Sequence, residues 1–151
     1  MLERITFHNC STFDSLVQDY ESEFSSITGK KKNDDGFYTL DSSWEEPYEG
    51  YYWTKNGKRI GFVIISIENE IADVAEFYVI PSFRNQGIGK IMAHSIFDKY
   101  HGRWQVRQIQ GADDAKAFWR AVIRSYKSGK YQESTVDDPT WGTVTCQTFD
   151  S

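Results

Sequence analysis

Apolar residues near the start of the chain recur at the spacing of a helix. Over residues 12–25 they fall three or four positions apart, which predicts an amphipathic helix with Ser11 as its N-cap. A short strand over 3–7 is expected before this helix. The stretch 36–49 has no clear period, and only a helical turn around 40–46 is expected in it. The inner face of the helix is expected to consist of Phe13, Leu16, Val17, Tyr20 and Phe24.

β-Branched and aromatic residues gather in the middle of the chain. Residues 51–54 and 59–67 predict a hairpin, because the Asn-Gly pair in the loop between them supplies the positive φ angles of a type I′ turn. Residues 74–80 predict a buried strand. Pro81 ends it, because proline has no N–H to donate to a ladder.

The second half of the chain predicts two helices and three strands. The first helix begins in a glycine turn at 87–89. A strand over 103–109 and a helix over 113–126 follow. Glycines then separate two closing strands, near 130–135 and 143–149.

Composition and charge restrict the class of protein. The chain is 39% hydrophobic and 26% charged, has no repeat or linker, and is expected to form one domain, 1–151. A net charge of -5 argues against nucleic acid as a partner. No apolar stretch is long enough to cross a membrane, so a cytoplasmic protein is expected. Cys10, Cys146 and the three histidines are scattered, so no metal site is expected.

The strongest chemical signal is the run RNQGIGK at 84–90, directly after the strand over 74–80. Its glycines let the backbone approach a ligand, and free N–H groups in the first turn of a helix favour anionic oxygens such as those of a pyrophosphate. The run lacks the G-x-x-x-x-G-K-[ST] string of a P-loop and the third glycine of a dinucleotide fingerprint. A phosphate-binding turn of another kind is therefore predicted.

The pattern Arg84-x-x-Gly87-x-Gly89 resembles the coenzyme A signature [Q/R]-x-x-G-x-[G/A] of the GNAT family of N-acetyltransferases. The order of the expected elements is similar to that family's order over nearly the whole chain. The resemblance implies an α/β fold of mixed α+β type, with a mostly antiparallel, splayed sheet of seven strands and helices on both faces. It also implies acetyl-coenzyme A as co-substrate and direct transfer of the acetyl group to a primary amine.

The same resemblance implies which residues hold the coenzyme. Strand positions 77–80 would lie beside the pantetheine arm, and the N–H groups of 86–90 would bind the pyrophosphate. Arg84 and Asn85 would shape the turn. The coenzyme-binding residues implied for the strand and turn are Phe77, Tyr78, Val79, Arg84, Asn85, Gln86, Gly87, Ile88, Gly89 and Lys90.

An amine acceptor must lose a proton, so a carboxylate near the thioester is expected. Asp73 matches the position of the general base in histone-type members, and Glu76 matches an acidic strand position of several small-molecule members. Strand alternation places the two on opposite faces unless a bulge intervenes. Glu76 is preferred, because a charge between Ala75 and Phe77 is unusual without a task. A salt-bridged or solvent-facing carboxylate is equally compatible with the sequence.

The last predicted helix is similar to the family's second motif, N-x-x-A-x-x-[FL]-Y, with two departures. An alanine replaces the asparagine that touches coenzyme A, so Asp113 is left to cap the helix. Trp119 replaces the tyrosine that protonates the thiolate, and an indole N–H is no usable acid. Phe118 and Trp119 are then expected to pack against the coenzyme, and Tyr126, Tyr78 or water to supply the proton.

An acidic and aromatic segment over 44–52 lies where the family builds its acceptor pocket. Trp44, Glu45 and Tyr51 are the acceptor-binding candidates, because carboxylates and aromatic rings suit a cationic amine. An exposed acidic loop with buried rings is the alternative.

Three function classes remain open. They are an N-acetyltransferase for a small cationic amine or a peptide amine, a GNAT-fold module or sensor that binds coenzyme A without turnover, and a transferase for an amine attached to a macromolecule. Exposed edges in the closing strands over 130–149 would also allow a homodimer.

Overall fold

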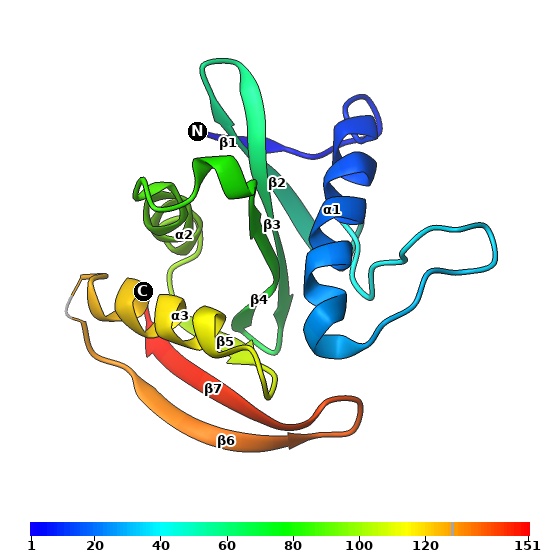
Figure 1. Cartoon of the computed structure of the whole chain (residues 1–151). Helices are drawn as coiled ribbons and strands as arrows, with labels where there is room; N and C mark the ends of the chain where they lie inside the picture. Colours follow the sequence, from blue (N-terminus) through cyan, green and yellow to red (C-terminus); the bar gives the residue numbers. More distant parts are fainter. Residues whose placement is uncertain (128) are drawn as a thin grey trace. The chain divides into compact units, whose positions relative to one another are not determined.

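The computed structural model describes residues 1–127 and 129–151, which form a seven-stranded mixed sheet flanked by helices (Figure 1). The strand order is β1-β2-β3-β4-β5-β7-β6, and β4 runs parallel to β5. The mixed α/β class predicted from the sequence is therefore confirmed. The elements are β1 (Leu2–Arg4), α1 (Ser11–Thr28), β2 (Tyr48–Lys55), β3 (Lys58–Glu68), β4 (Ile71–Val79), the 3₁₀ turn η1 (Pro81–Phe83), α2 (Ile88–Phe97), β5 (Arg103–Gln108), α3 (Asp113–Arg124), β6 (Gln132–Asp138) and β7 (Gly142–Asp150).

The chain divides into two compact units. The first unit comprises residues 1–65 and 75–89, and the second comprises 66–74 and 90–151. β3, β4 and α2 each contribute residues to both units. The expectation of a single domain over 1–151 stays a prediction.

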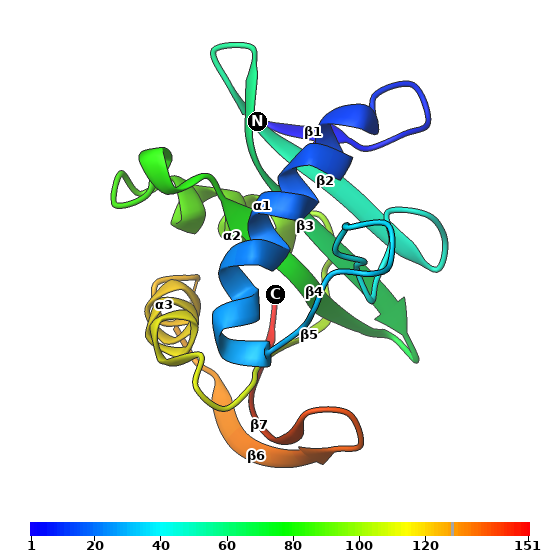
Figure 2. The same ribbon diagram turned by 45° about the vertical axis from the view of Figure 1, so that its right-hand side comes forward.

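The core of the first unit forms where α1 lies along β2 and β3 (Figure 2). The α1 residues at helical spacing that were expected to face inward include three that are fully buried, Phe13, Leu16 and Val17. They pack with Tyr52 from β2 and Phe62 from β3. Burial of this apolar stripe is what holds a helix of ordinary propensity in place.

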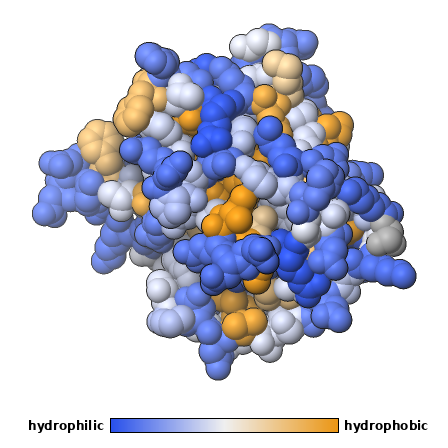
Figure 3. Space-filling model, turned by 180° about the vertical axis from the view of Figure 1, so that it is seen from behind, coloured by the Kyte–Doolittle hydropathy of each residue, from blue (hydrophilic) through white to orange (hydrophobic). Residues whose placement is uncertain are grey.

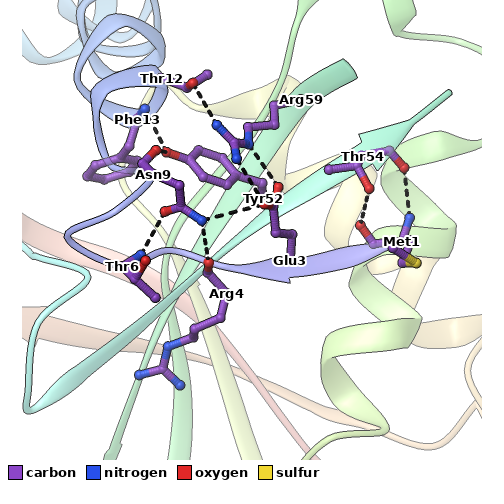
Figure 4. Close-up of polar contacts among 10 residues, drawn as sticks. All are labelled: Met1, Glu3, Arg4, Thr6, Asn9, Thr12, Phe13, Tyr52, Thr54 and Arg59. Carbon is purple, nitrogen blue, oxygen red and sulfur yellow. Dashed lines mark hydrogen bonds and ion pairs between the residues drawn. The ribbon is translucent and has the colours of Figure 1, made fainter. Parts of the chain in front are cut away.

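The start of α1 corrects the predicted N-cap. Ser11 is the first helical residue, and Cys10 holds the cap position without a side-chain hydrogen bond. The Phe13 N–H instead donates to the Tyr52 hydroxyl at 2.8 Å, and this hydroxyl donates to the Asn9 carbonyl at 2.7 Å (Figure 4). A side chain from β2 thus supplies the acceptor that a capping residue normally supplies.

A second contact ties the same end of α1 to the sheet. The guanidinium of Arg59 binds both oxygens of Glu3, at 2.8 and 2.9 Å, and donates to the Thr12 hydroxyl at 2.9 Å (Figure 4). Charged, two-pronged hydrogen bonds of this kind have a fixed geometry. β1, α1 and β3 are therefore held in one arrangement at this end of the helix.

The first hairpin turn is as predicted. Asn56 and Gly57 have φ angles of 52° and 75°, the positive values that a type I′ turn requires. The turn from β3 to β4 has the same character, with φ angles of 51° at Asn69 and 64° at Glu70.

The segment after α1 is irregular, and the helical turn predicted around 40–46 is absent from it. Residues 38 and 39 are held instead by side chains of α1 and of the loop that follows it. The Gln18 side chain accepts from the Tyr38 N–H at 2.8 Å and donates to the Tyr38 carbonyl at 2.9 Å. Lys30 donates to the Thr39 carbonyl at 2.8 Å. An amide side chain that satisfies both backbone groups of one residue replaces the hydrogen bonds that a helix would provide.

The second unit is built around an antiparallel set of strands in which β7 pairs with both β5 and β6. Phe97 at the end of α2 packs edge-on against Trp104 at 5.1 Å, Tyr126 at 5.2 Å and Phe149 at 4.7 Å. These rings form an aromatic core, because edge-to-face pairs at this distance are favourable. β6 is last in the strand order, and its residues 132–137 are exposed, so the predicted homodimer through this edge stays a prediction.

Several predicted boundaries shift. β4 begins at Ile71 rather than at 74, because residues 71–74 pair with β5. β6 runs to Asp138 rather than 135, because its partner β7 continues opposite it. α3 ends at Arg124 rather than 126, and the Tyr126 N–H bonds to the Ile123 carbonyl in a tighter turn. Pairing with a distant strand cannot be seen in a local sequence window.

The surface viewed in Figure 3 is mostly hydrophilic, and apolar side chains reach it in small patches. Across residues 1–127 and 129–151, none of the helices combines the length and the apolar character needed to span a membrane.

Candidate functional site

The glycine turn lies between β4 and α2. Pro81–Phe83 form one 3₁₀ turn, and α2 begins at Ile88. Asn85 and Gly87 have φ angles of 61° and 77°. A Cβ on Gly87 would meet no atom within 4 Å, so glycine is needed here for its positive φ and not for space. Positive φ beside a helix start turns backbone N–H groups toward one side, as an anion-binding turn does.

Two backbone N–H groups of this turn are free to bind a ligand. Those of Gln86 and Gly87 donate to no other residue that the structure describes. Ile88, Gly89 and Lys90 then form the first turn of α2, where N–H groups have no partner within the helix. The residues predicted to hold a pyrophosphate therefore lie together around one helix start.

Arg84 links the turn to β4 and α1. Its guanidinium donates to the Val79 carbonyl at 2.9 Å and binds both oxygens of Glu23 in α1, at 2.7 and 2.9 Å. It also lies 5.6 Å from the centre of the Tyr78 ring. This agrees with the predicted role of shaping the turn, because the donors of Arg84 are already engaged by the protein.

Glu76 lies on β4 in a polar cluster of the first unit. The Tyr20 hydroxyl from α1 donates a short hydrogen bond to one carboxylate oxygen, and the Ser42 hydroxyl donates to the other at 3.2 Å. Burial raises the pKa of Glu76 to about 7, with a contribution from the charge of Glu21, although the two hydroxyl donors favour the ionised form. A carboxyl with this pKa can take up and release a proton at neutral pH.

Tyr20 is suited to hold that carboxylate. Its ring packs edge-on against Phe62 at 5.4 Å and Tyr78 at 5.6 Å. Removal from water raises the pKa of the Tyr20 phenol well above its usual value, with the charge of Glu76 as the next cause. The phenol therefore stays protonated and acts as a hydrogen-bond donor.

A second buried carboxyl, Glu21, lies next to this cluster. It is 3% exposed, and its Oε2 has no hydrogen-bond partner among the described residues. Its other oxygen faces Lys30 at 3.4 Å, and Lys30 also approaches Asp41 at 3.6 Å. Burial raises the pKa of Glu21 more than Lys30 lowers it.

Asp73, the other candidate base, lies on β4 in the second unit and is committed to β5. Its carboxylate accepts from the Gln105 side chain at 2.5 Å and pairs with Arg107 at 3.1 Å. Burial raises the pKa of Asp73, and Arg107 opposes this shift. Asp73 and Glu76 thus have different partners from different elements, and Asp73 has the character of a structural ion pair.

The residues of the second predicted motif are placed by α3. Asp113 is the first helical residue and Ala112 holds the cap position without a side-chain bond, so Asp113 does not cap the helix as predicted. Trp119 is buried 6.3 Å from Phe97, and Phe118 packs edge-on against it at 5.0 Å. Both rings pack against other aromatic rings, and neither side chain has a group that can act as a general acid.

Tyr126 has its hydroxyl bonded within the protein. It donates to Asp98 at 2.6 Å, and burial together with this carboxylate raises the pKa of Tyr126 above its usual value. The Tyr78 hydroxyl, by contrast, makes no hydrogen bond to another described residue, and burial raises the pKa of Tyr78 as well.

The three residues predicted to bind the acceptor amine do not share one cavity in the structure. Trp44 lines a cavity of about 340 Å³ between α1 and the residues after it, and Glu45 and Tyr51 do not. Tyr51 donates to Glu49 at 2.8 Å, and Arg4 pairs with Glu49 at 3.1 Å. The acidity expected of this region is therefore partly neutralised within the protein.

Sequence reasoning missed two members of the Glu76 cluster. Tyr20 was expected on the inner face of its helix, but nothing in its spacing indicated that its hydroxyl would meet a carboxylate 56 residues away. Ser42 lies in a segment without periodicity. The only available signal was the isolated charge of Glu76 within an apolar strand, which required partners of some kind.

Comparison with known proteins adds an independent finding. A family model described as the acetyltransferase (GNAT) family matches residues 13–126. No curated protein sequence matches the chain significantly.

Solved structures are similar to the chain over almost its full length. The ribosomal-protein-S18-alanine N-acetyltransferase from Escherichia coli is 13% identical, with a TM-score of 0.64 over 99% of this chain and 92% of that one. An aminoglycoside acetyltransferase in complex with coenzyme A is 13% identical, with a TM-score of 0.71 over 99% and 94%. A GNAT acetyltransferase from Elizabethkingia anophelis with acetyl-CoA bound is 10% identical, with a TM-score of 0.61 over 100% and 97%. At these identities the likeness concerns the fold alone.

Proposed function

We propose that this chain, which belongs to the acetyltransferase (GNAT) family and is an acetyl-coenzyme A-dependent N-acetyltransferase, passes the acetyl group directly to a primary amine with Glu76 as the proton acceptor. The family predicted from the glycine motif is confirmed by the family model. The acceptor is a small cationic amine or a peptide amine, as the sequence suggested.

The observation that supports the proposal most directly is the pKa of Glu76 together with the hydrogen bonds of its carboxylate. Its pKa of about 7 leaves it able to accept a proton from an ammonium group at neutral pH and to return that proton to water. Tyr20 and Ser42 hold the two carboxylate oxygens in a defined orientation. A carboxylate that were only structural would be expected to pair with a cation, as Asp73 does with Arg107.

The co-substrate supplies a thioester carbonyl that an amine can attack. In the proposed reaction the ammonium group gives one proton to Glu76, and the neutral nitrogen then bonds to this carbon. The carbon–sulfur bond breaks, the thiolate takes a proton from a tyrosine or water, and the second nitrogen proton replaces the proton given to the thiolate. Tyr126 is the first candidate for this proton. Tyr78 is the second, because its hydroxyl makes no hydrogen bond to another residue that the structure describes.

The glycine turn would hold the coenzyme. The N–H groups of Gln86 and Gly87 and of the first turn of α2 would bind the pyrophosphate, with the positive end of the helix dipole behind them. Phe77, Tyr78 and Val79 would lie along the pantetheine arm. Phe118 and Trp119 would give the coenzyme apolar contact, and Asp113 would remain near the start of their helix.

A coenzyme A-binding module without turnover is the second candidate. It is favoured by Trp119, which occupies the place of the family's acidic tyrosine and is buried in packing.

In either case the free thiols of Cys10 and Cys146 suit a reducing compartment, in agreement with the cytoplasmic location expected from the sequence.

Substitution Glu76→Gln separates the two candidates. It keeps the side-chain shape and removes the proton acceptor, so we expect unchanged binding of acetyl-coenzyme A by calorimetry and a fall in kcat of about 100-fold or more. In the wild-type enzyme kcat/KM should fall below an apparent pKa near 7, because the protonated carboxyl cannot accept a proton.

Asp73→Asn is the matched control. It removes the other buried carboxylate of β4, and the pH limb near 7 should persist in it. If the limb vanishes in Asp73→Asn and persists in Glu76→Gln, the assignment of the base is wrong. If the wild-type protein binds acetyl-coenzyme A but acetylates no amine, the binding-module candidate replaces the enzyme.

A further inference from the structure

A cavity of the first unit shares one residue, Ser42, with the Glu76 cluster. It has a volume of about 340 Å³, near the lower end of the range for small-molecule sites. One of its lining residues is Ser42, whose hydroxyl donates to Glu76 at 3.2 Å. A molecule in this cavity can therefore reach Ser42, the residue whose hydroxyl donates to the proposed proton acceptor. Its lining consists of Phe13, Asp14, Val17, Gln18, Phe37, Tyr38, Leu40, Ser42, Ser43 and Trp44.

The lining of the cavity includes an aromatic ring, Phe37, that is mostly exposed to solvent. Phe37 is 57% exposed, far more than a ring that contributes to the core. The Asn33 side chain accepts from the Phe37 N–H at 2.9 Å and holds this residue in a closed turn. An exposed ring on a braced backbone offers apolar area to a ligand at a low cost in conformational entropy.

Trp44 forms the other aromatic side and is fixed by its surroundings. Its ring packs edge-on against Phe7 at 4.8 Å. A Cβ on Gly50 of β2 would come within 2.6 Å of the Trp44 Cβ, so Trp44 lies directly against this strand because Gly50 has no side chain. Trp44 thus provides one aromatic wall of the cavity that packing already holds in place.

The cavity contains little negative charge. Asp14 is the one charged residue of its lining, and Glu45 does not contribute to it. Glu49, a further carboxylate of the acidic segment, already pairs with Arg4 at 3.1 Å. A ligand with several ammonium groups would lose hydration at each of them without gaining a carboxylate for each.

We infer that the acceptor is a small primary amine with an aromatic body and a single positive charge, whose ring lies against Phe37 and Trp44 and whose amino group lies near Ser42 and Glu76. The inference rests on the proposed function and names the substrate class of the same site. In the transfer, the ammonium group gives one proton to Glu76, and the neutral amine nitrogen then bonds to the acetyl carbon. The thioester carbon–sulfur bond breaks, and the second nitrogen proton goes through water to the departing thiolate. Aminoglycosides and polyamines, with their several charges, are poor acceptors.

The test is a comparison of acceptors, with release of coenzyme A thiol as the readout. We expect kcat/KM for 2-phenylethylamine to exceed that for ethylamine by about tenfold or more, because only the former buries a ring. Kanamycin and spermidine should be acetylated more slowly than 2-phenylethylamine. A higher kcat/KM for kanamycin or spermidine overturns the inference and leaves the proposed acetyltransferase intact.

Phe37→Ala locates the ring of the acceptor. It should raise KM for 2-phenylethylamine about threefold to tenfold with little change in kcat, because it removes contact that is equal in the ground and transition states. KM for ethylamine should change less than about twofold. Trp141→Ala is the matched control, because Trp141 is also an exposed aromatic residue but does not line the cavity.

A binding measurement separates failure of this inference from failure of the proposed function. Saturation-transfer NMR with 2-phenylethylamine and coenzyme A should show contact in the wild-type protein and a weaker signal in Phe37→Ala. Contact without turnover would support the cavity assignment and contradict the catalytic proposal. No contact, or the same contact in both proteins, would overturn the cavity assignment.

Discussion

Glu76 shows how the surroundings of one residue decide its chemistry. Asp73 and Glu76 lie three positions apart on β4, and burial raises the pKa of both. Asp73 has a guanidinium partner at 3.1 Å, which favours its charged form. Glu76 is held by two neutral hydroxyl groups and reaches a pKa of about 7. The sequence could nominate both carboxylates, but the difference between them depends on partners that are distant in sequence.

Gly87→Ala tests the anion-binding turn at the residue scale. The φ of 77° costs an L-residue about 1–2 kcal/mol, and the strain should move the N–H groups that face the pyrophosphate. We expect acetyl-coenzyme A to bind about tenfold more weakly by calorimetry. Gly57→Ala is the control, since its φ is 75° and its Cβ also meets no atom within 4 Å. Equal loss of affinity in both variants would contradict the assignment.

At the scale of elements, the start of α1 depends on a residue of β2. The Tyr52 hydroxyl accepts a hydrogen bond from the Phe13 N–H. In most helices a nearby capping side chain accepts this bond. The predicted cap, Ser11, is a suitable residue type one position too late. Local capping rules therefore placed the helix start to within one residue but named the wrong acceptor, because the Tyr52 hydroxyl from another element accepts the hydrogen bond of the Phe13 N–H.

Tyr52→Phe should destabilise the protein by about 1–3 kcal/mol. It leaves a buried N–H and a carbonyl without their partner, and the cost is that of unmet hydrogen bonds. Urea denaturation at pH 7 measures this loss. Tyr131→Phe, which removes a hydroxyl that accepts a longer bond of 3.4 Å from Arg124, should change the free energy of unfolding by less than about 0.5 kcal/mol. Equal losses would show that the hydroxyl of Tyr52 has no special role.

For the whole molecule, buried carboxyls determine how stability depends on pH. The pKa values of Glu21, Asp73 and Glu76 are raised, so the folded protein holds more protons than the unfolded chain between a pH of about 4.5 and 7. The free energy of unfolding therefore falls as pH rises through this window. Glu133 acts in the opposite sense, because Arg120 lowers its pKa to about 2, and its contribution is lost in acid below about pH 4.5.

We expect the protein to be more stable at pH 5.5 than at pH 8, by on the order of 2 kcal/mol. Urea denaturation at the two pH values measures the difference. In Glu76→Gln the difference should shrink, because one buried carboxyl no longer ionises. Greater stability at pH 8 than at pH 5.5 in the wild-type protein would contradict this account.

The sequence by itself determined the order of the elements, the Asn-Gly hairpin and the glycine turn of an acetyltransferase. Each of these follows from local rules: apolar periodicity, positive φ at special residues, and free N–H groups at a helix start. The Ser11 cap and the helical turn around 40–46 were predicted by the same rules and were wrong. At the helix start, the Tyr52 hydroxyl accepts the hydrogen bond of the Phe13 N–H that a local cap would have accepted.

Only the tertiary structure decided which polar groups meet. It brought Tyr20 and Ser42 to Glu76 and paired Asp73 with Arg107. It also placed Trp44, but not Glu45 or Tyr51, in the lining of the cavity beside α1. The physical reason is that pKa values, burial and cavities depend on contacts between residues far apart in the chain. Local spacing encodes which face of an element a residue occupies, and packing then decides what that residue touches.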